Sequence, residues 1–393
     1  MRRINPVPIK FLNLRMKLPA SNPTAQLAYN LFSLVAIIAI LYIMKPFLVP
    51  LLISVILSVM VFPIVNFLEK KLRFNRIFSA LTVLLILGVI IVTLIWLISA
   101  QISNFVGKSD LYTTKLTELY NETLLYFENN FGLNRSQLVN QNEIKFETLI
   151  RNNFSKIGDF LSSSTGILSD LFLIPIYIFF LLFYRKFFVE FIHKAFPEKN
   201  NKFLNIILAK IYDVQKSYLL GLFTVMLIVG ILNSVGLLLL GIENAIFFGF
   251  LAALLLLIPY IGIIIGSLLP ALVALATKDS AWYSLGVIGV FGFVQFLEGN
   301  FITPKITGSK VSVNAFISIV SLVLFSMLWG TAGMILALPI TASLKIIFDH
   351  TPNMKPYGFL IGEPLEEHLK SKAKIRLEHW EEIREQKESE ETI

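Results

Sequence analysis

Residues 245–276 read AIFFGFLAALLLLIPYIGIIIGSLLPALVALA, a run of 32 residues without a charged side chain. One straight α-helix of that length would measure about 48 Å, whereas the hydrocarbon core of a bilayer is about 30 Å thick. Pro259 lies near the middle of the run, and Gly262, Gly266 and Pro270 follow it, which favours an interruption of the helix there. We therefore expect a hairpin or a discontinuous helix inside a membrane.

A second long apolar stretch, residues 313–348, is interrupted in a similar way. Gly330 and Gly333 lie near its middle, and Pro339 lies further along. Because glycine and proline both weaken a helix interior, we expect a second broken or re-entrant hairpin here.

The two expected hairpins decide on which side of the membrane Lys305 and Lys310 lie. If both segments are hairpins, the span between them, from about residue 281 to residue 297, runs inward and places these lysines in the cytoplasm. If both segments cross straight through, the lysines lie outside. The excess of Lys and Arg in cytoplasmic loops favours the hairpins.

The whole chain has the composition of a membrane protein. Of its 393 residues, 55% are hydrophobic and 15% are charged, against about 25% charged residues in soluble domains. No charged residue lies in residues 77–107 or 311–344, and the alternation that a β-barrel needs is not visible. We expect an all-α fold, a polytopic transmembrane helical bundle with about eight hydrophobic segments, two of them broken or re-entrant hairpins.

Charge and polarity divide the chain into five regions. Residues 1–27 form a basic N-terminus that we expect in the cytoplasm, and residues 28–101 form three spans. Residues 102–165 are polar and predict a helical cap outside the membrane. Residues 166–348 hold the remaining spans and the broken hairpins, and residues 349–393 predict a charged helical tail. Both termini are expected in the cytoplasm.

Cysteine and the common sequence motifs of soluble enzymes are missing from the sequence. With no cysteine, the chain has no disulfide, no thiolate metal site and no thiol nucleophile. Common catalytic and nucleotide-binding motifs are not found. We expect no enzyme activity, no cofactor and no metal site, and the excess of basic residues indicates cytoplasmic loops and not nucleic-acid binding.

Glu298 is the ionisable residue that most favours a functional reading. It ends an uncharged apolar run, and Gln295 and Thr303 offer polar groups nearby. Gly299 and Pro304 predict that the helix stops or unwinds here. Unwound backbone at membrane depth can bind ions or polar solutes, and an intramembrane glutamate can exchange a proton.

A structural alternative for Glu298 is an interfacial carboxylate paired with Lys305 or Lys310. Asn233, midway along another span, is expected to bond a neighbouring helix or to line a path. The residues that could line a path are Glu298, Gln295, Asn300, Thr303, Pro304 and Asn233.

Glycines predict places where helices approach each other closely. Gly286, Gly289 and Gly292 recur on one helix face, and Gly262 and Gly266 form a GxxxG pattern. Such faces favour tight helix packing, and they make a homo-oligomer plausible.

Four motifs in register resemble the AI-2E family of bacterial transporters across most of residues 25–348. The matching segments are Ser217-Tyr218-Leu219-Leu220-Gly221, Ile258-Pro259-Tyr260-Ile261-Gly262 with Gly266 and Pro270, Glu298-Gly299-Asn300 with Pro304-Lys305-Ile306 and Gly308, and Gly330-x-x-Gly333-Met334 with Pro339. The sequence departs from the family pattern at Leu222, Ile263 and Asn314-Ala315, where many relatives carry Gln, Pro and His-Pro.

The resemblance implies a multi-pass protein of the bacterial inner membrane. It implies a secondary transporter that exports a small polar molecule similar to autoinducer-2, with the lipid bilayer and that solute as its partners. Broken apolar segments are also the sequence pointer to a transporter's binding site.

Two other functions are compatible with the same sequence. A monovalent cation/proton antiporter would use an intramembrane carboxylate, for which Glu298 is the candidate. A non-transporting envelope scaffold would use residues 102–165 and 349–393 to recruit partners.

Overall fold

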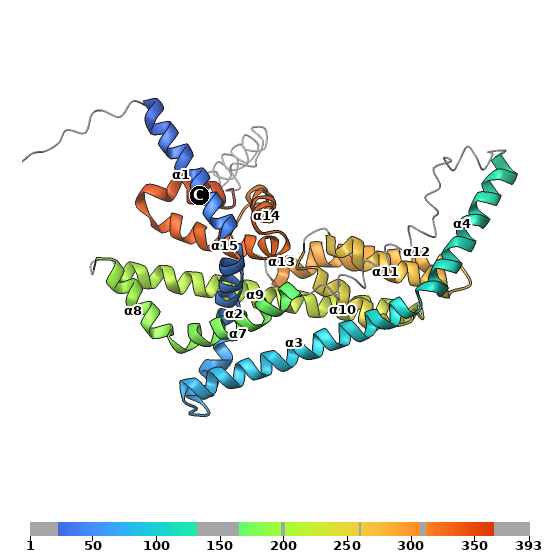
Figure 1. Ribbon diagram of the computed structural model, residues 1–393, viewed down its shortest axis with the longest axis horizontal. Helices are drawn as coiled ribbons and strands as arrows, with labels where there is room; N and C mark the ends of the chain where they lie inside the picture. The colour runs from blue at the N-terminus through green and yellow to red at the C-terminus, as the bar shows by residue number, and fades with distance from the viewer. Residues whose placement is uncertain (1–22, 132–164, 198–200, 259–260, 307–311, 365–393) are drawn as a thin grey trace, which may run out of the picture. The chain divides into compact units, whose positions relative to one another are not determined.

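The computed structural model describes residues 23–131, 165–197, 201–258, 261–306 and 312–364, and this part of the chain is helical without a strand (Figure 1). The all-α expectation is confirmed. The helices are α1 (Pro23–Ile43), α2 (Lys45–Lys70), α3 (Arg76–Gly107), α4 (Ser109–Phe131), α7 (Thr165–Phe183), α8 (Arg185–Ala195), α9 (Asn201–Leu239), α10 (Ala245–Leu255), α11 (Ile261–Thr277), α12 (Trp282–Leu297), η2 (Glu298–Ile302), α13 (Thr303–Ile306), α14 (Ala315–Trp329), α15 (Thr331–His350), η3 (Pro352–Met354) and α16 (Lys355–Ile361).

Six helical segments are long and apolar enough to cross a membrane, and a seventh candidate is the bent pair α7 and α8. The six lie in α1, α2, α3, α9, α15 and the continuous segment Trp282–Ile306. Many of their large apolar side chains are exposed, as at Leu85, Trp96 and Phe293. An apolar surface of this kind is stable against lipid and unfavourable in water. The chain is therefore a multi-pass membrane protein.

Residues 245–276 fold back on themselves, as the sequence predicts. α10 ends at Leu255, α11 begins at Ile261, and the two helices pack against each other. A Cβ atom on Gly262 would overlap the Leu255 carbonyl oxygen, and a Cβ atom on Gly266 would lie 2.7 Å from the Ala252 Cβ. With 11 residues, α10 is about 16 Å long, too short to cross a bilayer.

Residues 313–348 form a second helical hairpin, also as predicted. α14 and α15 pack against each other, and the chain reverses at Gly330, whose φ is 70°. L-amino acids rarely adopt this left-handed conformation, whereas glycine adopts it readily. Gly333 lets α15 start directly against α14, because a Cβ atom there would overlap the Phe325 carbonyl oxygen.

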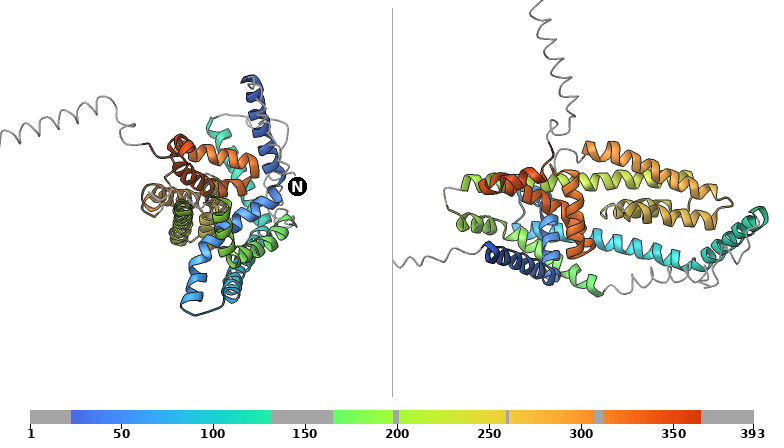
Figure 2. Two further views of the ribbon diagram at one scale, coloured as in Figure 1. Left: turned by 90° about the vertical axis from the view of Figure 1, so that its left-hand side faces the viewer. Right: turned by 90° about the horizontal axis from the view of Figure 1, so that it is seen from above.

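The two hairpins pack on different halves of α9 (Figure 2). The first hairpin contacts the C-terminal half, where a Cβ atom on Gly249 would overlap the Ser234 hydroxyl. The second contacts the N-terminal half, where the Gln215 Nε2 donates hydrogen bonds to the Pro339 carbonyl (2.6 Å) and to the Ser343 hydroxyl (2.8 Å). Pro339 and Pro270 lie inside α15 and α11, which continue past them.

The core consists of separate apolar clusters. One joins α2, α3 and α7 through residues such as Val65, Val83 and Ile178. Another joins α9 to the first hairpin and α12, through Leu237, Phe248 and Val287, and includes Tyr112 of α4.

Two predicted regions lie partly outside the described residues. Of the cap at 102–165, the structure describes α4, which packs against α11. Of the tail, it describes η3 and α16. Residues 1–22, 132–164 and 365–393 lie outside the described part of the chain. Residues 1–46, which contain α1, form a compact unit of their own.

Of the three glycines on α12, Gly286 alone supports the expectation of close packing in this chain. A Cβ atom on Gly286 would lie 3.2 Å from a methyl group of Leu240, whereas none of the described atoms lies within 4 Å of a Cβ atom on Gly289 or Gly292.

Candidate functional site

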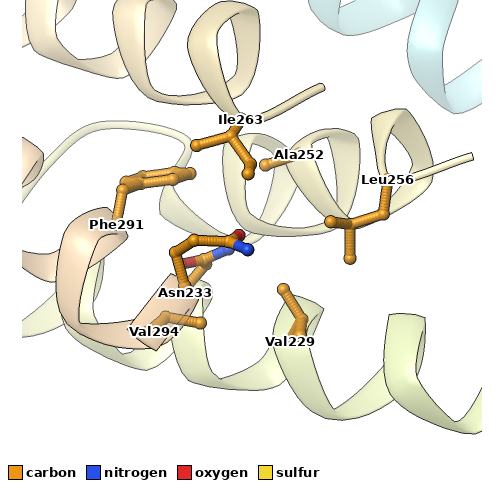
Figure 3. A pocket seen from close by; sticks show the side chains of 8 residues that line it. Val229, Asn233, Ala252, Leu256, Ile263, Phe291 and Val294 are labelled. Atoms are coloured by element: carbon orange, nitrogen blue, oxygen red, sulfur yellow. The ribbon is translucent and has the colours of Figure 1, made fainter. Parts of the chain in front are cut away.

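A small pocket lies where the first hairpin meets α9 and α12. α9, α10, α11 and α12 form a closed ring of contacts, in which each helix packs against the next and α12 packs against α9. The pocket opens within this ring, and the lining side chains come from all four helices (Figure 3). They are Val229, Asn233, Ala252, Leu256, Ile263, Phe291, Val294 and Gln295.

The pocket is narrow, and two amides are the polar side chains that line it. It encloses about 240 Å³ of empty space, part of which is open to solvent. The space that a water-sized molecule can occupy is about 10 Å³, close to the minimum that holds one water. An apolar wall with a few polar groups is typical of small-molecule sites.

Asn233 presents an unpaired acceptor to this pocket. The residue is 3% exposed, and its Oδ1 atom has no hydrogen-bond partner among the residues that the structure describes. Its neighbour Ser234 is also buried, but the Ser234 hydroxyl donates to the Gly230 carbonyl at 2.7 Å. A buried acceptor without a partner costs about 1–3 kcal/mol, so Asn233 is expected to bind a donor from water or solute that enters the pocket.

Gln295 connects the pocket to the predicted carboxylate. The Gln295 Nε2 donates to the Glu298 Oε2 at 2.7 Å, one helical turn away. The Thr303 hydroxyl donates to the other carboxylate oxygen, Oε1. The structure thus brings together three of the residues that the sequence singles out, and Gln295 belongs both to the pocket and to this carboxylate cluster.

Gly299 and Pro304 predict that the helix stops or unwinds at Glu298, and of these two outcomes the structure excludes the stop. Instead the helix widens into the π-helix η2 and then continues as α13. The backbone N–H of Thr303 donates to the Glu298 carbonyl, a bond that spans five residues. Short π-helical turns are rare and occur frequently at functional sites.

Pro304 and Asn300 explain part of this local geometry. Pro304 has no N–H to donate into the helix, so the regular hydrogen-bond ladder is interrupted at this point. The Asn300 Nδ2 donates to the Phe296 carbonyl, one helical turn before it, at 2.9 Å. Both side chains are exposed and neither lines the pocket.

The described residues do not support the structural alternative of an ion pair at Glu298. Lys305 is exposed and forms no ion pair with Glu298 in the described part of the chain. Lys310 lies outside the described residues. Within the ranges that the structure describes, no group of three His, Cys, Asp or Glu side chains could hold a metal ion.

The broken-helix residues fall at two separate places. Gly262 and Gly266 lie in α11, next to the pocket residue Ile263, while Pro259 lies outside the described residues. Gly330, Gly333 and Pro339 belong to the second hairpin and do not line this pocket. Sequence reasoning missed Gln215, although an amide close to the Ser217–Gly221 motif is a signal that could have indicated it.

Comparisons with known proteins match this chain to a family of transporters. The family model described as AI-2E family transporter matches residues 31–353. A protein of Haemophilus influenzae named "Putative transport protein" is 26% identical over 332 residues, which cover 80% of this chain and 90% of that protein. The Bacillus subtilis protein named "Putative transport protein YrrI" is 27% identical over 328 residues, covering 80% of this chain and 89% of that protein.

A further relative carries a substrate in its name. The Escherichia coli protein named "AI-2 transport protein TqsA" is 24% identical over 151 residues, which cover 38% of this chain and 44% of that protein.

Proposed function

We propose that this chain, which belongs to the AI-2E family of transporters, is a secondary transporter that exports a small polar molecule across the bacterial inner membrane. The proposed path runs through the pocket at the first hairpin and past the carboxylate cluster of Gln295, Glu298 and Thr303. No enzymatic step is assigned to the chain.

The unpaired Oδ1 of Asn233 is the observation that carries this proposal. In an apolar ring of helices, a buried acceptor without a partner is unfavourable unless a polar molecule visits it. The broken α10–α11 hairpin forms part of the same pocket. Broken segments near the membrane midplane are where secondary transporters bind their substrates.

Glu298 is proposed to couple transport to a proton or cation. Gln295 donates to its carboxylate from the pocket side. When the carboxylate gains a proton or a cation, this hydrogen bond changes, and the Gln295 amide is free to turn toward the pocket. The charge state of Glu298 would in this way change the affinity of the pocket for the solute.

We propose a solute similar to autoinducer-2 as the substrate, on the basis of sequence similarity to a named relative. Support comes from the name of TqsA, which aligns with 38% of this chain. Because Asn233 presents an unpaired acceptor to the pocket, we also propose that the solute carries a hydrogen-bond donor.

Flux through vesicles tests the coupling role of Glu298. We expect purified full-length chain in liposomes to release preloaded autoinducer-2 faster when a pH gradient is imposed. In Glu298→Gln, which keeps hydrogen-bonding capacity but cannot ionise, the flux should lose its response to the gradient. Asp279→Asn, which removes an exposed acid elsewhere, is the matched control and should keep the response. An unchanged pH response in Glu298→Gln would remove Glu298 from the mechanism.

Monovalent cation/proton antiport is the second candidate, and the carboxylate cluster favours it. Glu298 accepts two side-chain hydrogen bonds and has no ion-pair partner among the described residues, so it is available to a cation. Sodium-dependent proton movement in vesicles that contain no organic solute would favour antiport over export.

Membrane sidedness is proposed from charge, and assembly is proposed from glycines. Both termini are placed in the cytoplasm, residues 102–165 outside as a cap, residues 28–101 and 166–348 in the membrane, and residues 349–393 as a cytoplasmic tail. A homo-oligomer is proposed from the glycine face of α12. Its exposed Gly289 and Gly292 leave room for a second chain.

A further inference from the structure

The turn between α2 and α3 carries four basic residues and no acid. Lys70, Lys71, Arg73 and Arg76 are all exposed, and none of them forms an ion pair among the described residues. Leu72 (51% exposed) and Phe74 (43% exposed) alternate with these cations. Apolar side chains that face water are unfavourable. In the headgroup region of a bilayer, by contrast, cations can contact lipid phosphates while neighbouring apolar side chains contact acyl chains.

Arg73 occupies a backbone conformation that favours glycine. Its φ is 55°, and the reversal is closed by the Phe74 N–H, which donates to the Leu68 carbonyl at 3.1 Å. A residue with a Cβ atom is strained in this conformation, whereas glycine adopts it readily. Position 73 is thus occupied by arginine although glycine would adopt this conformation with less strain. This indicates that the positive charge of Arg73 has a role.

The one acid next to this turn is already neutralised. The Arg185 guanidinium donates to both carboxylate oxygens of Glu69, with Nη1 to Oε1 at 2.8 Å, and the pair is partly buried. Arg185 also lies 5.4 Å from the centre of the Phe62 ring. The four cations of the turn are therefore left uncompensated by Glu69.

The same ion pair attaches an amphipathic helix to the turn. Arg185 begins α8, which bends by 69° from α7. None of the α8 residues is buried, and its ionisable residues Arg185, Lys186, Glu190, His193 and Lys194 exclude it from hydrocarbon. Its side chains Phe187 (63% exposed) and Phe191 (62% exposed) are uncovered. A helix with these two faces is stable lying in the membrane interface.

We propose that the α2–α3 turn and α8 together form a binding site for anionic phospholipid. Lys70, Lys71, Arg73 and Arg76 bind the phosphate of the headgroup, and the exposed Phe and Leu side chains contact the upper acyl chains. The turn connects two candidate membrane spans, α2 and α3. It therefore lies at the membrane surface, at the depth where lipid phosphates are found. This site is independent of the transported solute.

The experiment is a lipid titration of the full-length chain in detergent, followed by its thermal unfolding. Cardiolipin is the anionic probe, phosphatidylcholine the zwitterionic one, and inorganic phosphate the free ion. We expect cardiolipin to raise the unfolding temperature at much lower concentration than phosphatidylcholine, and phosphate to have no effect. Each basic residue near an anionic surface contributes about a factor of five in affinity.

Two substitutions at one position separate binding from folding. Arg73→Lys keeps the charge and should keep the cardiolipin response. Arg73→Gly relieves the backbone strain, so the lipid-free protein should be as stable as before or more so, while cardiolipin affinity falls about fivefold. Lys70→Gln and Lys71→Gln added to Arg73→Gly should lower it about a hundredfold.

Three results would overturn the proposal. They are an equal response to phosphatidylcholine, an equal response to inorganic phosphate, and an unchanged cardiolipin affinity in the triple variant. Lys115→Gln in α4 removes an exposed lysine that pairs with Glu118, away from the proposed site, and should leave the affinity unchanged.

Discussion

Asn233 and Ser234 are adjacent buried polar residues that differ in whether their side chains are hydrogen-bonded. The Ser234 hydroxyl bonds the carbonyl one turn before it, as serines in helices commonly do. Asn233 faces the pocket (Figure 3), and within the described part of the chain its Oδ1 lacks a hydrogen-bond partner. The two residues should therefore respond differently to substitution, because one contributes to stability and the other is kept for binding.

Replacing Asn233 should separate stability from function. In Asn233→Leu an unpaired buried acceptor is removed and the branching at Cγ is kept, so stability should be unchanged or rise by up to about 1–3 kcal/mol. Vesicle flux should fall at least tenfold, since about 1.4 kcal/mol of lost solute binding is a factor of ten.

Ser234→Ala is the control for that measurement. It removes a satisfied hydrogen bond and should cost about 1 kcal/mol of stability while flux persists. Undiminished flux in Asn233→Leu would contradict the role given to the pocket.

Part of this residue-level picture could be predicted from the sequence. Polar residues within apolar runs are conspicuous, so Asn233, Gln295 and Glu298 are recognisable, and the spacing of Gln295 and Glu298 places them one helical turn apart. That Asn233 and Gln295 line one pocket could not be predicted, because their contact depends on how α9 and α12 pack. The widened turn at Glu298 depends similarly on tertiary packing.

The first hairpin is shaped by contacts that require glycine. At Gly262 the backbone of α10 approaches so closely that any side chain would overlap the Leu255 carbonyl. Main-chain atoms cannot move aside as a flexible side chain can, so the hairpin itself would have to open.

Alanine substitutions at two glycines should have opposite effects. Gly262→Ala should destabilise the protein by about 1–3 kcal/mol and reduce flux, because the arms of the hairpin are forced apart. Gly88→Ala, inside α3, meets none of the described atoms within 4 Å and should be neutral or stabilising by up to about 1 kcal/mol. Thermal unfolding of both variants measures this, and equal stability of the two would disagree with the hairpin geometry.

An ion pair connects the start of α4 to the turn between α9 and α10. The Lys108 ammonium donates to Glu243 at 2.6 Å, and this hydrogen bond raises the pKa of Lys108 above its usual 10.5. A raised lysine pKa means that the stabilisation is complete below pH 10.5 and is lost as the pH rises through the folded-state value. Since both side chains are about half exposed, the pair contributes about 0.2–1 kcal/mol.

The stability difference between wild type and Lys108→Gln should decrease at high pH, because the wild type loses this ion pair when Lys108 loses its proton. It should be constant from pH 7 to 9 and shrink above pH 10.5. Thermal unfolding at several pH values measures it, and a difference that grows with rising pH would be inconsistent with this pair.

Element boundaries show where sequence reasoning succeeds. The reversals between α10 and α11 and at Gly330 were predictable, because proline and glycine interrupt runs too long for one span. Pro270 and Pro339 carried less information, since α11 and α15 continue past them. Proline inside a membrane helix is tolerated when neighbouring groups satisfy the freed backbone. The Gln215 amide, whose Nε2 donates to the Pro339 carbonyl at 2.6 Å, is one such neighbour.

At the scale of the molecule, two helical hairpins pack along different halves of α9, and one of them forms a pocket with α9 and α12. The central claim is that polar solute reaches this pocket from water. The chain contains no cysteine, so a single introduced thiol reports on one position without further changes.

The most direct test is the reaction of single-cysteine variants with a charged, membrane-impermeant methanethiosulfonate reagent in oriented vesicles. Asn233→Cys and Ile263→Cys place the thiol in the pocket, whereas Phe293→Cys places it on the outward face of α12, where Phe293 is 62% exposed to the surroundings of the chain. The account predicts that both pocket thiols react and that the thiol at position 293, in contact with lipid, does not. Reaction at position 293 with two inert pocket thiols would contradict it.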